Sequence, residues 1–195
     1  MRVKLTFLEP VLGTWPSNEN IARDFIASKA PDASTIEDEI AALGADAVAE
    51  KGKTVFPRTD GQPILYDYQI KGFFKDACGM LARVKSKKSS ALKAYKKIID
   101  GLIFVEPRMI PIEINGEIGE CQRPLRAPTP QGERVALVNS EEIPAGSSIE
   151  LEITMLDEKA HKDIVLEWLD YGRLRGIGQW RNSGKGRFTY EVLAD

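Results

Sequence analysis

The segment GRLRGIGQWRNSGKGRF, residues 172–188, joins a helical pattern to an alternating pattern typical of a strand. Five glycines occur within residues 172–186, and the cations between and beside them are accompanied by no acid. Glycine permits positive φ angles and close backbone approach, so exposed amide groups in such a segment can hold an anion. Arginine can bind phosphate through paired hydrogen bonds, and Trp180 can stack on a base. Taken alone, the segment is either an anion-binding loop or a glycine-rich connection without a ligand.

Two familiar phosphate-binding motifs do not match this segment. A P-loop, GxxxxGK[ST], needs Ser or Thr after its lysine. Here Gly186 follows Lys185, and the spacing from Gly178 to Gly184 is one residue too long. A dinucleotide fingerprint follows a strand and opens a helix, whereas this segment follows a predicted helix and precedes a predicted strand. Both motifs are therefore excluded.

Hydrophobic spacing on either side of the segment predicts an α+β fold. Apolar residues alternate in strand fashion at 2–8, 149–155 and 188–192, and β-forming residues dominate 102–105 and 109–114. Helical spacing marks 20–29, 36–50, 68–84, 91–99 and 160–174. The order fits a β-α-β-β-α-β core, that is, a ferredoxin-like (RRM-like) antiparallel sheet with helices on one face. We expect one domain over 1–195, with an acidic helical insertion at 17–53 and a projecting loop at 116–134.

Charge is strongly segregated along the chain, although the formal net charge is only −2. The stretch 32–50 holds six acids and no base, whereas 71–97 holds nine bases and a single acid, Asp76. Local charge therefore permits binding to nucleic acid, while the global charge says nothing about it. The basic run is equally compatible with an ordinary solvated face.

Composition favours an intracellular globular protein. The chain has 195 residues, of which 43% are hydrophobic and 29% charged. It contains no apolar run long enough to cross a membrane, and no signal-peptide core is recognisable. Cys78 and Cys121 lie in unrelated contexts, which indicates reduced thiols rather than a disulfide framework. We expect a cytoplasmic protein with no membrane association and no cofactor.

Three stretches taken together resemble the RAMP superfamily, the ferredoxin-like RNA-binding proteins that form the backbone of CRISPR effectors. LTFLEPVLG at 5–13 resembles the family's opening strand and following turn, and 172–188 resembles its glycine-rich loop. GQPILYDYQIKGFFKDA at 61–77 resembles the family's hairpin and helix start, with Gln69 where serine is commoner. The chain also resembles uncharacterised reading frames of phages and prophages.

The resemblance implies a protein that binds single-stranded RNA along the RNA backbone, with protein partners or further copies of itself beside it. By position, the RNA-binding residues would be Lys71, Lys75, Arg173, Arg175, Gly176, Gly178, Trp180, Arg181, Gly184, Lys185 and Gly186. Arg123, Arg126 and Arg134 would lie on a projecting hairpin that separates bases. The most direct expectation is an RNA-binding module without catalytic activity, linked to CRISPR-type machinery.

Two alternatives remain open. A metal-dependent ribonuclease would need an acid near the first strand, for which Glu19, Asp24 and Asp32 are candidates without a recognisable motif. His161, the single histidine, is more simply a solvated residue near a helix start than a general base, and no Cys/His spacing indicates zinc. The other alternative is an interaction module that has lost RNA binding and docks its acidic stretch on a partner. We assign no catalytic or metal-binding residue.

Overall fold

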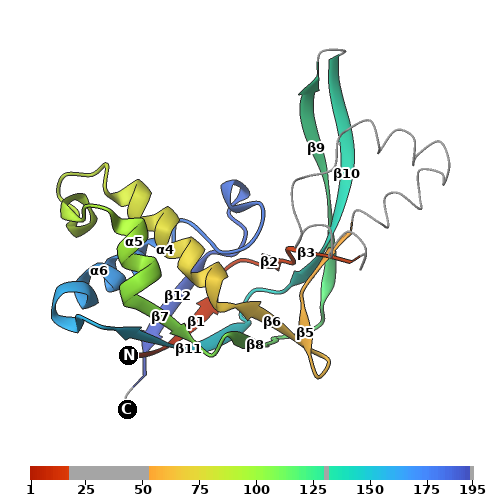
Figure 1. Ribbon diagram of the computed structural model, residues 1–195. Coiled ribbons are helices and arrows are strands. Elements are labelled where there is room, and N and C mark those ends of the chain that lie inside the picture. Colours follow the sequence, from red (N-terminus) through yellow and green to blue (C-terminus); the bar gives the residue numbers. More distant parts are fainter. Residues whose placement is uncertain (18–52, 130–131, 194–195) are drawn as a thin grey trace.

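The computed structural model describes residues 1–17, 53–129 and 132–193, with side chains described outside 125–137 (Figure 1). Its central sheet is antiparallel and runs in the order β12-β1-β11-β8-β6-β5, with β7 also paired to β11. The strands are β1 (Arg2–Phe7), β5 (Arg58–Thr59), β6 (Gln62–Tyr66), β7 (Ile103–Glu106), β8 (Met109–Glu113), β11 (Ser148–Met155) and β12 (Phe188–Val192). The first and last strands thus lie side by side next to β11, which is the strand order of a ferredoxin-like sheet and confirms the predicted fold class.

In the described part of the chain, three helices cover one face of this sheet: α4 (Asp67–Leu81), α5 (Tyr95–Leu102) and α6 (Glu158–Tyr171) (Figure 1). Alternation in β1 turns Val3, Leu5 and Phe7 into the core beneath them. The rings of Phe74 in α4 and Trp168 in α6 lie 5.5 Å apart between centroids. Burial of such large side chains contributes about 1.5–3 kcal/mol each, so the period-two and helical patterns together define this core.

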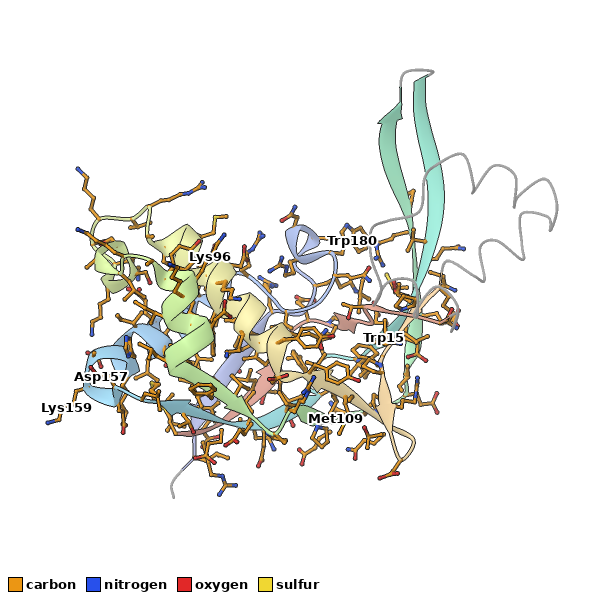
Figure 2. The ribbon with its side chains drawn as sticks, in the orientation of Figure 1. Trp15, Lys96, Met109, Asp157, Lys159 and Trp180 are labelled. Atoms are coloured by element: carbon orange, nitrogen blue, oxygen red, sulfur yellow. The ribbon has the colours of Figure 1, made fainter. Side chains whose placement is uncertain are left out.

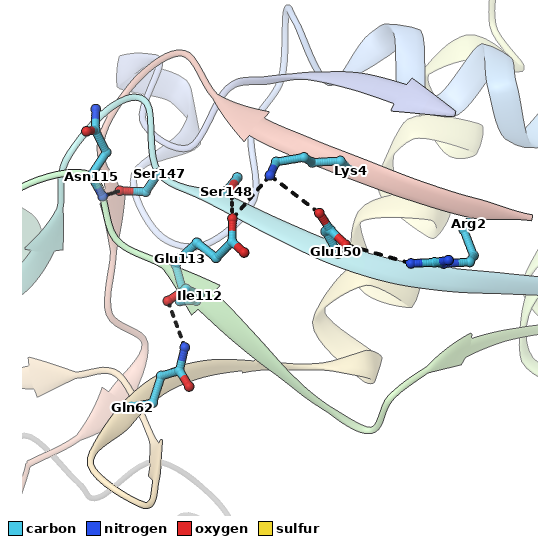
Figure 3. Close-up of polar contacts among 9 residues, drawn as sticks. All are labelled: Arg2, Lys4, Gln62, Ile112, Glu113, Asn115, Ser147, Ser148 and Glu150. Atoms are coloured by element: carbon cyan, nitrogen blue, oxygen red, sulfur yellow. Dashed lines mark hydrogen bonds and ion pairs between the residues drawn. The ribbon is translucent and has the colours of Figure 1, made fainter. Parts of the chain in front are cut away.

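The other face of the sheet carries charged side chains joined in ion pairs (Figure 3). Lys4 Nζ lies 3.1 Å from Glu113 Oε2 and 3.4 Å from Glu150 Oε1, and Glu150 also faces Arg2 at 4.0 Å. The hydrogen bond to Glu113 raises the pKa of Lys4, and the same bond lowers the pKa of Glu113. An RRM stacks bases on aromatic side chains of its sheet, whereas these positions hold paired charges. The RRM likeness therefore extends to the topology of the sheet and not to the side chains on its open face.

A long hairpin projects from the body next to this sheet (Figure 1). β9 (Gly119–Thr129) and β10 (Gly132–Ile143) pair antiparallel from Gly119 opposite Glu142 to Thr129 opposite Gly132. Short strands β2 (Val11–Leu12), β4 (Thr54–Val55) and β3 (Trp15–Pro16) complete the smaller sheet at its base. Composition predicted a loop over 116–134, and the family resemblance placed a projecting hairpin there. Most of the stretch is strand, so the composition gave the wrong element and the hairpin is present. Among the described residues β9 pairs with β10 alone, and an edge strand tolerates proline at positions such as Pro124 and Pro128.

Other differences are local. The predicted basic helix at 91–99 is instead a short 3-10 turn, η1 (Lys88–Ala91), followed by α5, which begins only at Tyr95. The predicted helices of the acidic insertion lie outside the described residues. In the described part of the chain, no helix combines the length and the apolar character that crossing a membrane requires.

Glu167 of α6 anchors the turn η1 to the helix layer. Its carboxylate accepts hydrogen bonds from the backbone amides of Lys88 (2.9 Å) and Ser89 (3.0 Å) and from Ser89 Oγ (2.6 Å). The buried Trp168 Nε1 in turn donates to Ser89 Oγ at 3.0 Å. Burial raises the pKa of Glu167, but the hydrogen bonds from Ser89 and Lys88 outweigh that effect and the pKa lies below its usual value.

We expect Glu167→Gln to lower the free energy of unfolding by about 1–2 kcal/mol at about pH 7, because charged hydrogen-bond acceptors are stronger than neutral ones. A carboxyl whose pKa is lowered by folding stabilises the protein above its unfolded pKa, near 4.5, and loses that contribution as the pH falls. The difference between the two proteins should therefore shrink below about pH 4. Urea unfolding of both proteins at about pH 7 and below about pH 4 measures this difference in the free energy of unfolding. A difference that is the same at the two pH values would contradict this account.

Candidate nucleic-acid interface

The glycines of the segment 172–188 allow its backbone to fold against itself. Ile177 N donates to Gly186 O at 3.0 Å. A Cβ on Gly176 would lie 2.2 Å from backbone atoms of Lys185 and Gly186. A Cβ on Gly186, whose φ is +70°, would lie 2.0 Å from Ile177 O. Packing within the segment accounts for Gly176 and Gly186, and contact of these glycines with RNA stays a prediction.

Backbone hydrogen bonds join the segment 172–188 to the turn that follows β1. Leu8 N donates to Arg187 O at 2.7 Å, and Gly186 N donates to Pro10 O at 2.9 Å. Gly178, with φ at +85°, lies against Leu12 O. The stretches 5–13 and 172–188, both quoted for the family resemblance, therefore contact each other in the folded chain.

The third stretch of the resemblance joins them through Asp76 of α4. Its Oδ2 accepts hydrogen bonds from Arg175 Nε at 2.6 Å and from Arg181 Nη1 at 3.0 Å. Arg175 Nη1 also donates to Asn182 Oδ1 at 3.0 Å, and all three charged side chains are partly exposed. The single acid of the basic run thus orients two arginines and leaves one positive charge in excess.

The other predicted phosphate ligands differ in their surroundings. Lys75 Nζ lies 2.6 Å from Asp100 Oδ1, and Lys185 Nζ lies 2.8 Å from Glu142 Oε2. Lys71 Nζ donates to Asp100 O and lies 5.0 Å from the centroid of the Phe104 ring. Arg173 is exposed and has no side-chain partner among the described residues. Partly exposed ion pairs contribute about 0–1 kcal/mol, so phosphate can replace a carboxylate at little cost.

Trp180 lies at the turn of the segment, and Arg123 supports it from the hairpin. The indole is 41% exposed, and the guanidinium Cζ of Arg123 lies 5.4 Å from its ring centroid. Arg123 itself is only 3% exposed and donates to Ser140 Oγ at 3.0 Å and to Gln179 Oε1. The family resemblance placed Arg123 on the projecting hairpin as a contact to bases, but the structure buries it at the hairpin base. The side chains of Arg126 and Arg134 lie outside the described residues.

Exposed cations gather where α4 ends and the chain continues into α5. Lys88 there forms an ion pair with Asp163. The other exposed cations form no ion pair among the described residues, and Figure 2 shows Lys96 on the outside of the helix layer: Arg83, Lys85, Lys87, Lys93, Lys96 and Lys97. Of these, Lys87 lies close enough to Glu167 for its charge to lower the pKa of that carboxyl. Sequence reasoning alone could not separate this run from a solvated face, and the structure adds that six of its cations are exposed without an ion pair among the described residues.

The residues weighed for catalysis do not assemble into a reactive centre within the described chain. His161 was expected to be solvated but is only 7% exposed, with Nδ1 at 2.9 Å from Asp157 O in the same helix start. Cys78 is buried in α4, and burial raises its pKa. No group of three metal-binding side chains occurs in the described ranges. Glu19, Asp24 and Asp32 lie outside them.

Three solved structures of Cmr proteins are similar to this chain. The chain matches part of a cryo-EM structure of Type III-B Cmr-beta bound to cognate target RNA with a TM-score of 0.55 at 11% identity, over 99% of this chain and 58% of that one. It also matches Cmr6 from Pyrococcus furiosus (TM-score 0.48, 12% identity, 98% and 97% of the two chains). A third match is Cmr4 (TM-score 0.45, 10% identity, 99% of each chain).

The Cmr-beta match supports the fold that the sequence resemblance predicted. At 11% identity the likeness establishes the fold alone, and this chain spans 58% of the length of the matched Cmr-beta chain. No family model and no curated protein matches the sequence. What the chain binds must therefore be argued from its own residues.

Proposed function

We propose that the protein binds single-stranded RNA without cleaving it, as a subunit or accessory of CRISPR-type machinery. The observation that carries the proposal is an excess of positive charge around an exposed indole. The segment 172–188 and the hairpin base place Arg123 against the Trp180 ring and join Arg175 and Arg181 to Asp76, while Arg173 of the same segment is exposed. Among the described residues, Asp76 is the one carboxylate that pairs with these arginines. Phosphate supplies the missing negative charge, and a base can stack on the indole.

The arrangement suits a flexible strand better than a small ligand. Its guanidinium groups are fixed by Asp76 and Asn182 while remaining partly exposed, so little ordering is needed when phosphate arrives. The exposed run 83–97 extends the positive charge to the far end of α4. A groove of distributed cations with stacking aromatics is typical of single-strand binders.

The cellular setting belongs to the same proposal. Cys78 and Cys121 are both free thiols, which favours the reducing cytoplasm. Solved structures of the same fold come from a complex bound to target RNA, which supports RNA and protein-complex partners for this chain. The phage or prophage origin suggested by the sequence stays a prediction.

A titration of fluorescein-labelled single-stranded RNA, followed by anisotropy and then by a denaturing gel in the presence of Mg²⁺ or Mn²⁺, tests the proposal. We expect saturable binding and intact RNA. Shortened RNA that appears with the metal ion and disappears with EDTA would replace the non-catalytic function with the ribonuclease alternative. Absence of binding at low salt would favour the interaction module instead.

A further inference from the structure

Three aromatic rings form a row on the surface near the start of α4. Trp15 comes from β3, Tyr66 from the end of β6 and Tyr68 from the first turn of α4. The rings of Tyr66 and Tyr68 stack at 5.3 Å with an interplanar angle of 14°, and Trp15 lies 6.1 Å from Tyr66 at 47°. Tyr68 is 53% exposed and the neighbouring strand β8 adds Met109, which is 47% exposed. The core therefore does not account for this row.

Gln69 holds the row in place. Its Oε1 accepts a hydrogen bond from Tyr66 N at 2.8 Å, and its Nε2 donates to Thr14 Oγ1 at 3.0 Å. One side chain thus ties the residue before Trp15 to the strand end that carries Tyr66. Rings fixed in this way lose little conformational freedom when a flat ligand stacks on them, which makes the row preorganised for binding.

One acidic and one basic side chain, Asp67 and Arg108, lie beside Tyr68. Arg108 is exposed, and its backbone carbonyl accepts a hydrogen bond from Asp67 N beside Tyr68. Burial raises the pKa of Tyr68, whereas the positive charge of Arg108 lowers it by a smaller amount. A phenol whose pKa is raised stays neutral at physiological pH and adds no charge that would repel phosphate.

Residues 12–15 connect the aromatic row with the glycine-rich segment 172–188. Leu12 contacts Gly178, Thr14 contacts Gln69, and Trp15 begins the row. Figure 2 shows Trp15 and Trp180 both toward the hairpin side of the helices. A single strand that passes from one site to the other would follow residues 12–15.

We propose that Trp15, Tyr66 and Tyr68 form a second stacking platform for unpaired RNA bases. This inference rests on the proposed RNA-binding function and adds a contact to the bases, separate from the arginines that contact phosphate. The platform reads the flat face of a base, so it tolerates any sequence.

Two labelled oligomers of equal phosphate number test the platform: oligouridylate and an abasic ribose-phosphate chain. We expect Tyr68→Ala to weaken binding of oligouridylate about tenfold, in line with one lost stacking contact, and to leave binding of the abasic oligomer unchanged. Tyr68→Phe keeps the ring and should keep the affinity. Met80→Ala removes another exposed apolar side chain at the opposite end of α4 and serves as the matched control.

The outcomes separate the two proposals. If wild-type protein binds both oligomers equally, or if Tyr68→Ala binds oligouridylate as wild type does, the platform is wrong while RNA binding stands. Equal losses for Tyr68→Ala and Met80→Ala would likewise overturn it. If the wild-type protein binds neither oligomer, the proposed function fails and the platform fails with it.

Discussion

Replacing Gly186 by alanine should lower the free energy of unfolding by about 2–5 kcal/mol. The added Cβ would lie 2.0 Å from Ile177 O, and the position of Ile177 is fixed by the hydrogen bond from its N to Gly186 O. Forced contacts of this kind cost about 1–3 kcal/mol or more, and the left-handed φ of +70° adds about 1–2 kcal/mol for any residue with a Cβ. Urea unfolding followed by tryptophan fluorescence, to which the buried Trp168 contributes, measures the loss.

Gly184→Ala is the matched control for that change. Gly184 also has a left-handed φ, +87°, but the nearest atom to its added Cβ lies 3.7 Å away on the Arg187 side chain. Gly184→Ala should therefore lower the free energy of unfolding only by the cost of the left-handed φ, about 1–2 kcal/mol. Equal losses for the two variants would mean that the segment does not fold against itself as the structure describes.

Changing Arg173, Arg175 and Arg181 together to alanine should weaken binding of single-stranded RNA at least about tenfold at low salt. Each cation that neutralises a phosphate releases counterions, and a single strand loses about 0.7 in the slope of log affinity against log salt for each one. The triple variant should therefore show a slope shallower by about 2. Fluorescence anisotropy at several salt concentrations gives both quantities.

Two further variants serve as controls for this prediction. The combination Arg2→Ala, Lys4→Ala and Lys159→Ala removes the same charge from the open sheet face and the start of α6, and should leave RNA affinity nearly unchanged. Arg173→Ala alone removes an exposed side chain without a described partner, so it should leave the fold intact and lower the slope by about 0.7. If the control triple loses as much affinity as the arginine triple, binding follows total charge and not this site.

The strands with strict alternation were predictable because one of their faces is buried. Arg2–Phe7 and Ser148–Met155 each place apolar residues on the helix side and charges on the other, so the period of two is visible in the sequence. Alternation did not indicate β6, because Pro63, Ile64 and Leu65 are buried in succession and break the period of two. The hairpin of β9 and β10 was implied by the family resemblance and not by composition, because its prolines were taken as loop signals, although an edge strand accommodates them.

The candidate site was predictable in its residue types and not in its pairing. Glycines and arginines at 172–188 were evident, but Asp76 lies 99 residues from Arg175 in sequence and meets it only in the folded chain. The burial of Arg123 and of His161 is likewise a product of tertiary packing. Trp15, Tyr66 and Tyr68 come from three segments, and their spacing in the sequence gave no sign that they stack.

The salt dependence of RNA binding by the unaltered protein tests the central claim most directly. Labelled single-stranded RNA would be titrated at about 50 mM and about 200 mM salt, and the dissociation constants compared. If Arg173, Arg175, Arg181 and the run 83–97 contact phosphate, affinity should fall steeply between the two, with a slope that exceeds that of the arginine triple variant by about 2. Binding that is absent at the lower salt, or that does not change with salt, would contradict the account.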